Sequence, residues 1–206
     1  MNENAGKSKE LILEAAIKLF ADKGFNGTTV SEIAKEAGLS QGMIYYIFES
    51  KDHILVEILD SFKSELTRVF TTIYSKDEYG SYRGHWDTDE IKEGMEFFIQ
   101  NRQLWVVLFS ESLKSMTGKE NLIGIWDSLN KNIRQQLLSN RGFSLSHGDI
   151  TRDLVDLFFV FMPAVLFAIF VEDWRKMRGY SEEDAHQCFA SALNGVYTQF
   201  LQDTGN

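Results

Sequence analysis

The sequence predicts an all-α fold, and three features of the chain support this prediction. Apolar residues recur at helical spacing along most of the chain, and no segment shows convincing strand-like alternation. The 206 residues contain only one proline, a residue that disrupts helix interiors. Two segments begin with Thr29 or Ser181 and carry Glu32 or Asp184 three residues later, which is typical of a helix start.

The first helix is predicted from about Lys7 to Lys23, and Gly24 ends it. Its apolar residues form one stripe: Leu11, Ile12, Ala15, Ala16, Leu19 and Phe20. A second helix begins at Thr29, which forms a capping box with Glu32. Its apolar face consists of Val30, Ile33, Ala34 and Ala37.

Gly38 follows the second helix at the position where a left-handed residue ends a helix, and glycine adopts that conformation freely. Ser40 then caps a third short helix with the sequence QGMIYY, residues 41–46. Two helices joined by a short glycine-containing turn predict a helix-turn-helix, which places its second helix in the DNA major groove.

Several residue types of this segment suit contacts with DNA. Gln41 can pair with adenine through two hydrogen bonds, and Gly42 allows close backbone approach. Met43 can touch a thymine methyl group, although packing is the commoner role of methionine. Tyr45 and Tyr46 are adjacent, so we expect one of them to pack inside and the other to reach DNA. The predicted DNA-binding set is Thr28, Thr29, Ser40, Gln41, Gly42, Met43, Tyr45, Tyr46 and Lys51.

Thr28, Thr29 and Lys51 each have two interpretations. The threonines are turn and cap residues or phosphate donors, and the two roles are compatible. Lys51 lies in the first turn of the next helix, where a cation opposes the helix dipole. A bound phosphate would explain that placement, whereas the alternative is a solvated lysine offset by Asp52.

Further residues extend the pattern of this segment: Phe48, Ser50-Lys51 and Ile54-Leu55 downstream, and Ile12–Ala16, Leu19-Phe20 and Gly24-Phe25 upstream. With these residues, the segment resembles the DNA-binding signature of tetracycline-repressor (TetR) type regulators. The resemblance implies an all-helical homodimer that pairs through its last two helices. It also implies a variable C-terminal domain that binds a small molecule, and it favours Tyr46 for the DNA side. Ile47 and Glu49 depart from the family pattern, and Glu49 would repel phosphate if it faced DNA.

The net charge of −9 is unusual for a DNA-binding protein. Residues 1–55 carry six lysines and eight acidic side chains, a net charge of −2. The remaining residues carry −7. This acidity motivates an alternative function, a helical ligand-binding or scaffolding protein that has lost DNA binding.

The rest of the chain is predicted as further helices, so that residues 1–50 form a helix-turn-helix domain and residues 51–206 a helical effector-binding and dimerisation domain. Helices are expected over Ser50–Tyr74, Thr88–Asn101, Arg102–Met116, Glu120–Leu138, Asp149–Met177 and Ser181–Leu201. Thr117-Gly118 is expected to break the helical run, and Pro163 to kink its helix. Loops are expected over Ser75–Asp87 and Asn140–Gly148.

The C-terminal part is rich in aromatic residues and methionine. Core and dimer packing is the simplest explanation, but binding pockets are lined by the same residue types. In members of the family that this chain resembles, a cavity forms among the middle helices. The predicted lining of an effector site is Trp105, Phe109, Trp126, Phe158 and Met162, for a small apolar or amphipathic molecule.

Other classes of protein are disfavoured. Leu157–Val171 is an uncharged run of fifteen residues, whereas a membrane span needs about twenty, so a buried helix and no membrane partner are expected. A single cysteine and a polar N-terminus favour the cytoplasm. No catalytic motif is present, no cofactor is expected, and His186 with Cys188 gives only a weak indication of metal.

These observations predict a ligand-responsive transcriptional repressor. A homodimer would place two recognition helices in successive major grooves of a near-palindromic double-stranded operator. An effector would release the protein by favouring a conformation in which the recognition helices are wrongly spaced.

Overall fold

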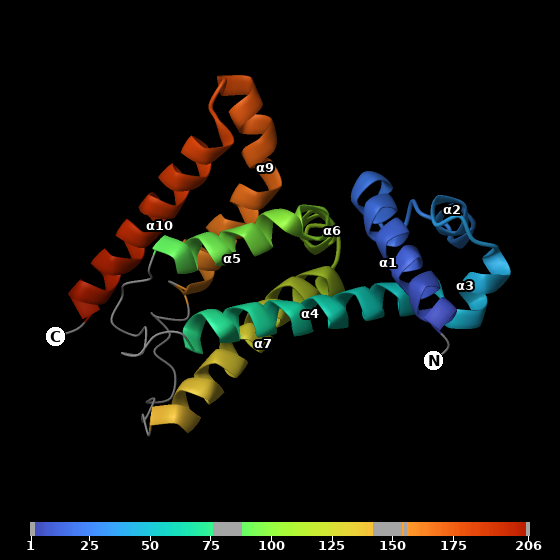
Figure 1. Ribbon diagram of the computed structural model, residues 1–206, viewed down its shortest axis with the longest axis horizontal. Helices are drawn as coiled ribbons and strands as arrows, with labels where there is room; N and C mark the ends of the chain where they lie inside the picture. Colours follow the sequence, from blue (N-terminus) through green and yellow to red (C-terminus); the bar gives the residue numbers. More distant parts are fainter. Residues whose placement is uncertain (1–2, 76–87, 142–153, 155, 205–206) are drawn as a thin grey trace. The chain divides into compact units, whose positions relative to one another are not determined.

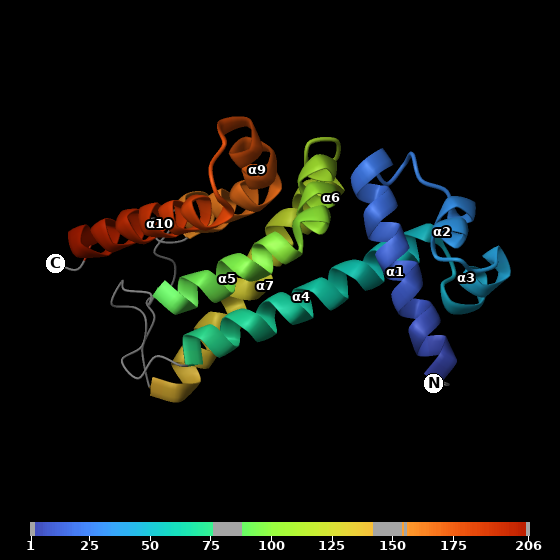
Figure 2. The ribbon, with the colours of Figure 1, turned by 45° about the horizontal axis from the view of Figure 1, so that its top comes forward.

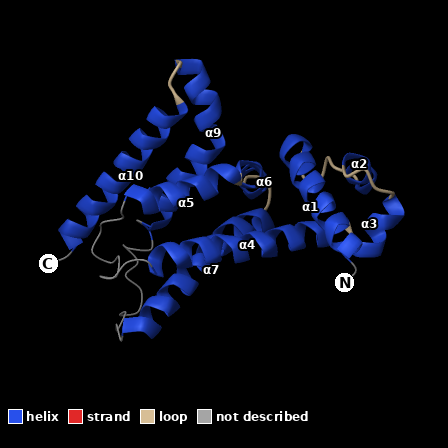
Figure 3. Cartoon of the chain, in the orientation of Figure 1, coloured by secondary structure: helices blue, strands red, loops and turns tan. Residues whose placement is uncertain are grey.

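The computed structural model describes residues 3–75, 88–141, 154 and 156–204, and Figure 3 shows helices and no strand among them. The predicted all-α fold is confirmed. The helices in Figure 1 are α1 (Glu3–Lys23), α2 (Val30–Glu36), α3 (Gln41–Ile47), α4 (Lys51–Ser75), α5 (Thr88–Gln100), α6 (Arg102–Ser112), α7 (Met116–Arg141), η2 (Asp156–Phe161), α9 (Met162–Arg178) and α10 (Glu182–Thr204). The predicted loops fall largely on residues 76–87 and 142–153, which lie outside the described residues.

The chain forms two compact units. The first comprises Met1–Glu65 and Val106–Ile123, and the second comprises Leu66–Trp105 and Gly124–Asn206. Helices α4, α6 and α7 each contribute to both units, because the division falls within them. The boundary predicted at residue 50 therefore stays a prediction, and each unit is described by itself.

Helices α1, α2 and α3 pack against one another in the first unit (Figure 2). Their shared core consists of Ile12, Ala15, Ala16, Leu19, Phe20, Ile33, Ala34, Ile44 and Phe48. Leu11, expected in this stripe, is 46% exposed instead. Leu11 lies one residue before Ile12 and therefore about 100° away around the helix, at the edge of the apolar face.

The turn between α2 and α3 has the geometry that the sequence predicts. Gly38 has a φ of +67°, its N–H donates to the Lys35 carbonyl, and the Leu39 N–H donates to the Ala34 carbonyl. These are the two hydrogen bonds of a Schellman motif. Ser40 then accepts a hydrogen bond from the Met43 N–H and caps α3. Backbone geometry and caps thus determine where α2 ends and α3 begins.

The break predicted at Thr117-Gly118 is in the wrong place. Helix α6 ends at Ser112, and α7 begins at Met116 and includes both residues. Ser115 accepts a hydrogen bond from the Gly118 N–H and so caps α7. A Cβ atom on Gly118 would lie 2.2 Å from the Glu111 carbonyl oxygen. Glycine is therefore needed here because two helix ends approach closely, not because the helix breaks.

Aromatic side chains form the core of the second unit. The Phe98 ring stacks on Trp105 with centroids 5.0 Å apart, and Phe161 contacts both Trp105 and Trp126 at 5.7 and 5.4 Å. Phe70 packs edge-on against Phe98. Aromatic packing of this kind stabilises a fold beyond the area that it buries.

Pro163 lies in the first turn of α9, directly after the π-helical segment η2. The sequence predicts a kink at Pro163, and the structure instead has a junction between a π-helix and an α-helix next to it. Proline lacks the N–H that would donate to a carbonyl of the preceding turn, and the change of helical form lies directly beside it. Gly179, with a φ of +73°, ends α9, and Ser181 caps α10 by accepting from the Asp184 N–H.

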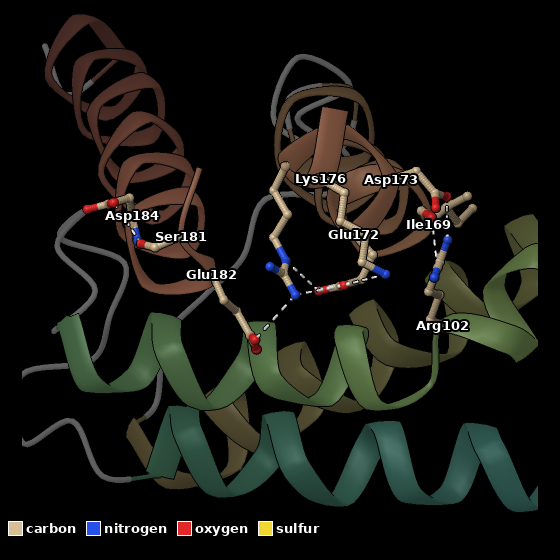
Figure 4. Close-up of polar contacts among 9 residues, drawn as sticks. Arg102, Ile169, Glu172, Asp173, Lys176, Ser181, Glu182 and Asp184 are labelled. Atoms are coloured by element: carbon tan, nitrogen blue, oxygen red, sulfur yellow. Dashed lines mark hydrogen bonds and ion pairs between the residues drawn. The ribbon is translucent and has the colours of Figure 1, made fainter. Parts of the chain in front are cut away.

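Helix α9 is tied to α6 by Arg102 (Figure 4). The guanidinium group donates to the Ile169 carbonyl at 2.9 Å and to the Asp173 carboxylate at 2.8 Å. Arg175 pairs with Glu172 at 2.8 Å and lies 3.7 Å from Glu182 at the start of α10. These contacts join α9 to the start of α6 and to the start of α10 within the second unit.

We predict that Gly38→Ala destabilises the protein by about 1–2 kcal/mol, because an L side chain is disfavoured at positive φ. Gly38→Asn should lose less. Gly124→Ala is the matched control, since Gly124 lies inside α7 and an added Cβ meets nothing within 4 Å. That substitution should be neutral or stabilising. Chemical denaturation measures all three, and equal effects of Gly38→Ala and Gly124→Ala would contradict the role of the turn.

Candidate nucleic-acid interface

Helix α3 presents an exposed polar and aromatic face on a buried apolar base. Ile44 is 1% exposed and Phe48 is 2% exposed, and both pack into the first unit. The outward residues are Ser40, Gln41, Gly42, Met43, Tyr45 and Tyr46. A short helix held rigidly on one side and free on the other has the form that a recognition helix requires.

The expectation that one of the two tyrosines packs inside is wrong. Tyr45 is 55% exposed and Tyr46 is 80% exposed. Ile44 and Phe48 lie four residues apart and occupy the inner face of this segment. Tyr45 and Tyr46 follow Ile44 by about 100° and 200° around the helix, so neither shares that face.

The two threonines have different environments. Thr29 is exposed and forms the predicted capping box, in which its hydroxyl accepts from the Glu32 N–H at 3.2 Å and its N–H donates to the Glu32 carboxylate at 2.9 Å. Thr28 is 1% exposed, and its hydroxyl donates to the carbonyl oxygens of Gly24 and Leu19 at 3.0 and 3.2 Å. This geometry gives Thr28 a role in the α1–α2 connection and does not present its hydroxyl to a phosphate.

Glu32 is the most perturbed acid of this region. A hydrogen bond from Lys23 at 2.7 Å, and then hydrogen bonds from the Thr29 N–H and hydroxyl, lower the pKa of Glu32 to about 2. Lys18 pairs with Glu36 and lowers the pKa of that carboxyl group in the same way. Two ion pairs therefore join α1 to α2.

Lys51 lies at the start of α4, and its ammonium group points back to the α1–α2 connection. The Nζ atom donates to the Phe25 carbonyl at 2.6 Å and to the Thr28 carbonyl at 2.7 Å. It also lies 4.4 Å from the centroid of the Phe25 ring, within range of a cation–π interaction. The phosphate contact predicted for Lys51 stays a prediction, and the structure gives the ammonium group protein partners.

Few lysines of the first 55 residues remain available for DNA. Lys9, Lys18 and Lys23 pair with Glu57, Glu36 and Glu32. Lys7 and Lys35 are exposed and form no ion pair with any side chain in the part of the chain that is described. The pairs neutralise acids that would otherwise repel DNA, but they also engage the cations that would attract it.

The predicted effector residues do not all fall in one unit. Trp105 is fully buried, Trp126 contacts Phe161, and Met162 begins α9 beside them in the second unit. Phe158 belongs to the same unit but is 56% exposed. Phe109 belongs to the first unit. The five residues therefore stay a prediction as a set.

Sequence patterns missed three residues of this region. Phe25 supplies a carbonyl and a ring to Lys51, Glu57 pairs with Lys9 across 48 residues, and His53 accepts a hydrogen bond from the Glu49 N–H. No local spacing could have indicated the first two, because both contacts join segments distant in sequence. The cap-like run Ser50–His53 did offer a signal for the third, since the Ser50 hydroxyl accepts from the His53 N–H.

Two short helices joined through Gly38, with an exposed second helix, define a helix-turn-helix protein. Residues 12–58 match the family model described as "Bacterial regulatory proteins, tetR family". This segment is therefore similar to the N-terminal part of that family, and the resemblance that the sequence predicted is confirmed.

Curated relatives support the assignment mainly at the N-terminus. The HTH-type transcriptional regulator YuxN of Bacillus subtilis is 53% identical over 55 residues, which are 26% of this chain and 19% of YuxN. The repressor KstR2 of Mycolicibacterium smegmatis is 25% identical over 204 residues, which cover 91% of this chain and 90% of KstR2. The matches to YuxN and to YerO of the same organism span less than a fifth of their lengths.

Solved structures show that the fold extends beyond the matched segment. A transcriptional regulator from Aquifex aeolicus superposes with a TM-score of 0.67 at 19% identity, covering 92% of this chain and 99% of that one. A TetR-like regulator from Rhodococcus superposes with a TM-score of 0.63 at 21% identity, covering 95% and 96%. At these identities the likeness concerns the fold alone.

The low pKa of Glu32 predicts a pH-dependent contribution to stability. Its folded-state pKa of about 2 lies below the ordinary value of 4.5, so the contribution is complete above pH 4.5 and is lost as the pH falls toward 2. Glu32→Gln should therefore be less stable than the wild type at pH 7. The difference should shrink below pH 4.5 and disappear near pH 2.

Thermal unfolding across this pH range measures the effect, with Glu14→Gln as the control because Glu14 is an exposed acid of α1. The Glu14 variant should follow the wild type at neutral pH. A stability difference between wild type and Glu32→Gln that is independent of pH would contradict the assignment.

Proposed function

We propose that this protein is a DNA-binding transcriptional regulator, acting by default as a repressor, whose homodimer binds a near-palindromic operator. The exposed face of α3 over the buried Ile44 and Phe48 carries this proposal. Gln41 would read bases, since a glutamine amide matches adenine, and Met43 would contact thymine methyl groups. Tyr45, Tyr46, Ser40 and Thr29 would contact bases or phosphates around it.

A homodimer is supported by the apolar residues that α9 exposes. One face of the helix is buried in the second unit through Ala164, Val165, Ala168, Ile169 and Val171. Leu166, Phe170, Trp174 and Met177 form a second stripe that is 37–85% exposed. Their spacing of four, four and three residues places them on one side of the helix. An exposed apolar stripe of this kind is typical of an interface, and the same stripe of a second copy would bury it in a symmetric dimer.

A membrane would be the other cover for this helix. Asp156–Arg178 is long and apolar enough to span a bilayer by length and composition, and one third of its most apolar window is buried. The buried opposite face favours a protein partner instead, because that face already packs within the second unit. We therefore place the protein in the cytoplasm as a dimer that pairs through α9 and α10.

An apolar or amphipathic small molecule is proposed as the effector. The aromatic cluster of Phe98, Trp105, Trp126 and Phe161 and the adjoining π-helix η2 support this proposal, because π-helical segments often occur at functional sites. Helix α4, whose residues belong to both units, would transmit the change. Release of bound operator by an added compound in the binding assay below would support it.

We predict that Tyr46→Ala weakens operator binding by about 1–3 kcal/mol, the range expected for a specific contact. Its effect on unfolding should stay within about 0.5 kcal/mol because the side chain is largely exposed. Fluorescence anisotropy with a duplex selected by the wild type from a randomised library measures the affinity. Leu113→Ala, which shortens a largely exposed side chain outside the helix-turn-helix, is the control.

The alternative function gives a different result in the same assay. If the folded wild-type dimer selects no duplex and binds all sequences equally weakly, the protein is a helical ligand-binding or scaffolding protein. The acidic first 55 residues and Glu49 are the features that would then explain the lost DNA binding.

We predict that Phe170→Glu converts the dimer into a folded monomer, because it places a charge in the middle of the exposed α9 stripe. Sedimentation velocity measures the mass, and circular dichroism checks the helix content. Leu113→Glu is the matched control, since Leu113 is 73% exposed in the first unit. A Phe170→Glu variant that dimerises as tightly as the wild type would remove α9 from the interface.

A further inference from the structure

We propose that Lys51 serves DNA recognition as a positioning residue: its ammonium group joins the start of α4 to the α1–α2 connection and thereby fixes the helix-turn-helix between them. This inference rests on the proposed DNA-binding function and assigns Lys51 a role other than phosphate contact. The observation behind it is the pair of hydrogen bonds from Nζ to the carbonyl oxygens of Phe25 and Thr28.

The two carbonyl groups lie in the connection directly before α2. Phe25 and Thr28 precede α2, and Thr28 is followed at once by Thr29, the N-cap of α2. Lys51 begins α4 just after α3. The two contacts, across 23 and 26 residues, therefore close a loop that contains both helices of the helix-turn-helix. Fixing the two ends of this segment restricts how α3 can tilt.

The ammonium group has little capacity left for a phosphate. It has three N–H donors, and two of them are directed at carbonyl oxygens at 2.6 and 2.7 Å. The Phe25 ring lies against the same group at 4.4 Å. The carbonyl dipoles and the ring face also offset the unfavourable position of a cation in the first turn of a helix.

The contacts of Thr28 and Lys51 together hold the α1–α2 connection in place. The Thr28 side chain is buried, and its hydroxyl already donates to Gly24 and Leu19. The α1–α2 connection is thus held from α1 by Thr28 and from α4 by Lys51. Removing the ammonium group would leave partly buried carbonyl groups without this donor, and the connection would have to rearrange.

Lys51→Met tests the proposal, because methionine keeps much of the side-chain length and removes the donors and the charge. Lys51→Arg keeps both. Lys119→Met is the matched control, an equal charge change at an exposed lysine of α7, outside the helix-turn-helix. Affinity for the selected duplex is measured across a salt series, well below the unfolding temperature of every variant.

A phosphate contact and a positioning role differ in the salt dependence of binding. The slope of log affinity against log salt is negative, and each lost phosphate contact makes it less steep by about 0.9. We expect Lys51→Met to bind at least about tenfold more weakly at every salt concentration with an unchanged slope. Lys51→Arg should recover most of the affinity. A slope less steep by about 0.9 per protomer, or an unchanged affinity, would overturn the positioning role.

A second measurement needs no DNA. Amide hydrogen exchange of the free dimer should accelerate at residues 25–29 and in α3 in Lys51→Met, and should stay unchanged in Lys119→Met. Unchanged exchange in Lys51→Met would overturn the proposal even if DNA binding were lost. If the wild type selects no duplex, the proposed function fails and the recognition role fails with it, while the exchange result still shows whether Lys51 holds the connection.

Discussion

The geometry of the first unit depends on the backbone conformation at Gly38. A φ of +67° lets the chain reverse directly after α2, and the two hydrogen bonds to the Lys35 and Ala34 carbonyls hold the reversal. The angle between α2 and α3 follows from this turn, and the burial of Ile44 then determines which face of α3 points outward. The turn at Gly38 and the burial of Ile44 therefore determine the direction in which each proposed base-contacting side chain points.

Charge in the first unit is organised for internal structure more than for attraction to DNA. Lys18 and Lys23 join α1 to α2 by pairing with acids, and Lys51 joins α4 to the connection before α2. Exposed ion pairs add little stability individually, but they neutralise acids close to a surface that must approach phosphate. An acidic domain of this kind would rely on shape and uncharged contacts, such as those of α3, more than on counterion release.

Helix α9 shows how one sequence pattern serves two purposes. Small residues such as Ala164 and Ala168 face the second unit and allow close packing, while Phe170 and Trp174 face outward. A sequence that is apolar all round therefore does not imply complete burial within one chain. The Arg102 contacts to Ile169 and Asp173 hold the inner face against α6, so that the outer face stays in a defined position.

The sequence by itself determined the helical class, the caps at Thr29 and Ser40, the turn at Gly38 and the buried position of Ile44 on α3, because each depends on a local pattern of a few residues. It missed the true boundary between α6 and α7, since the close approach of Gly118 to Glu111 is not visible in local propensity. It expected one buried tyrosine where two are exposed. Only the tertiary structure decided the partners of Lys51, because they lie 23 and 26 residues away and are backbone atoms that carry no signal of side-chain type.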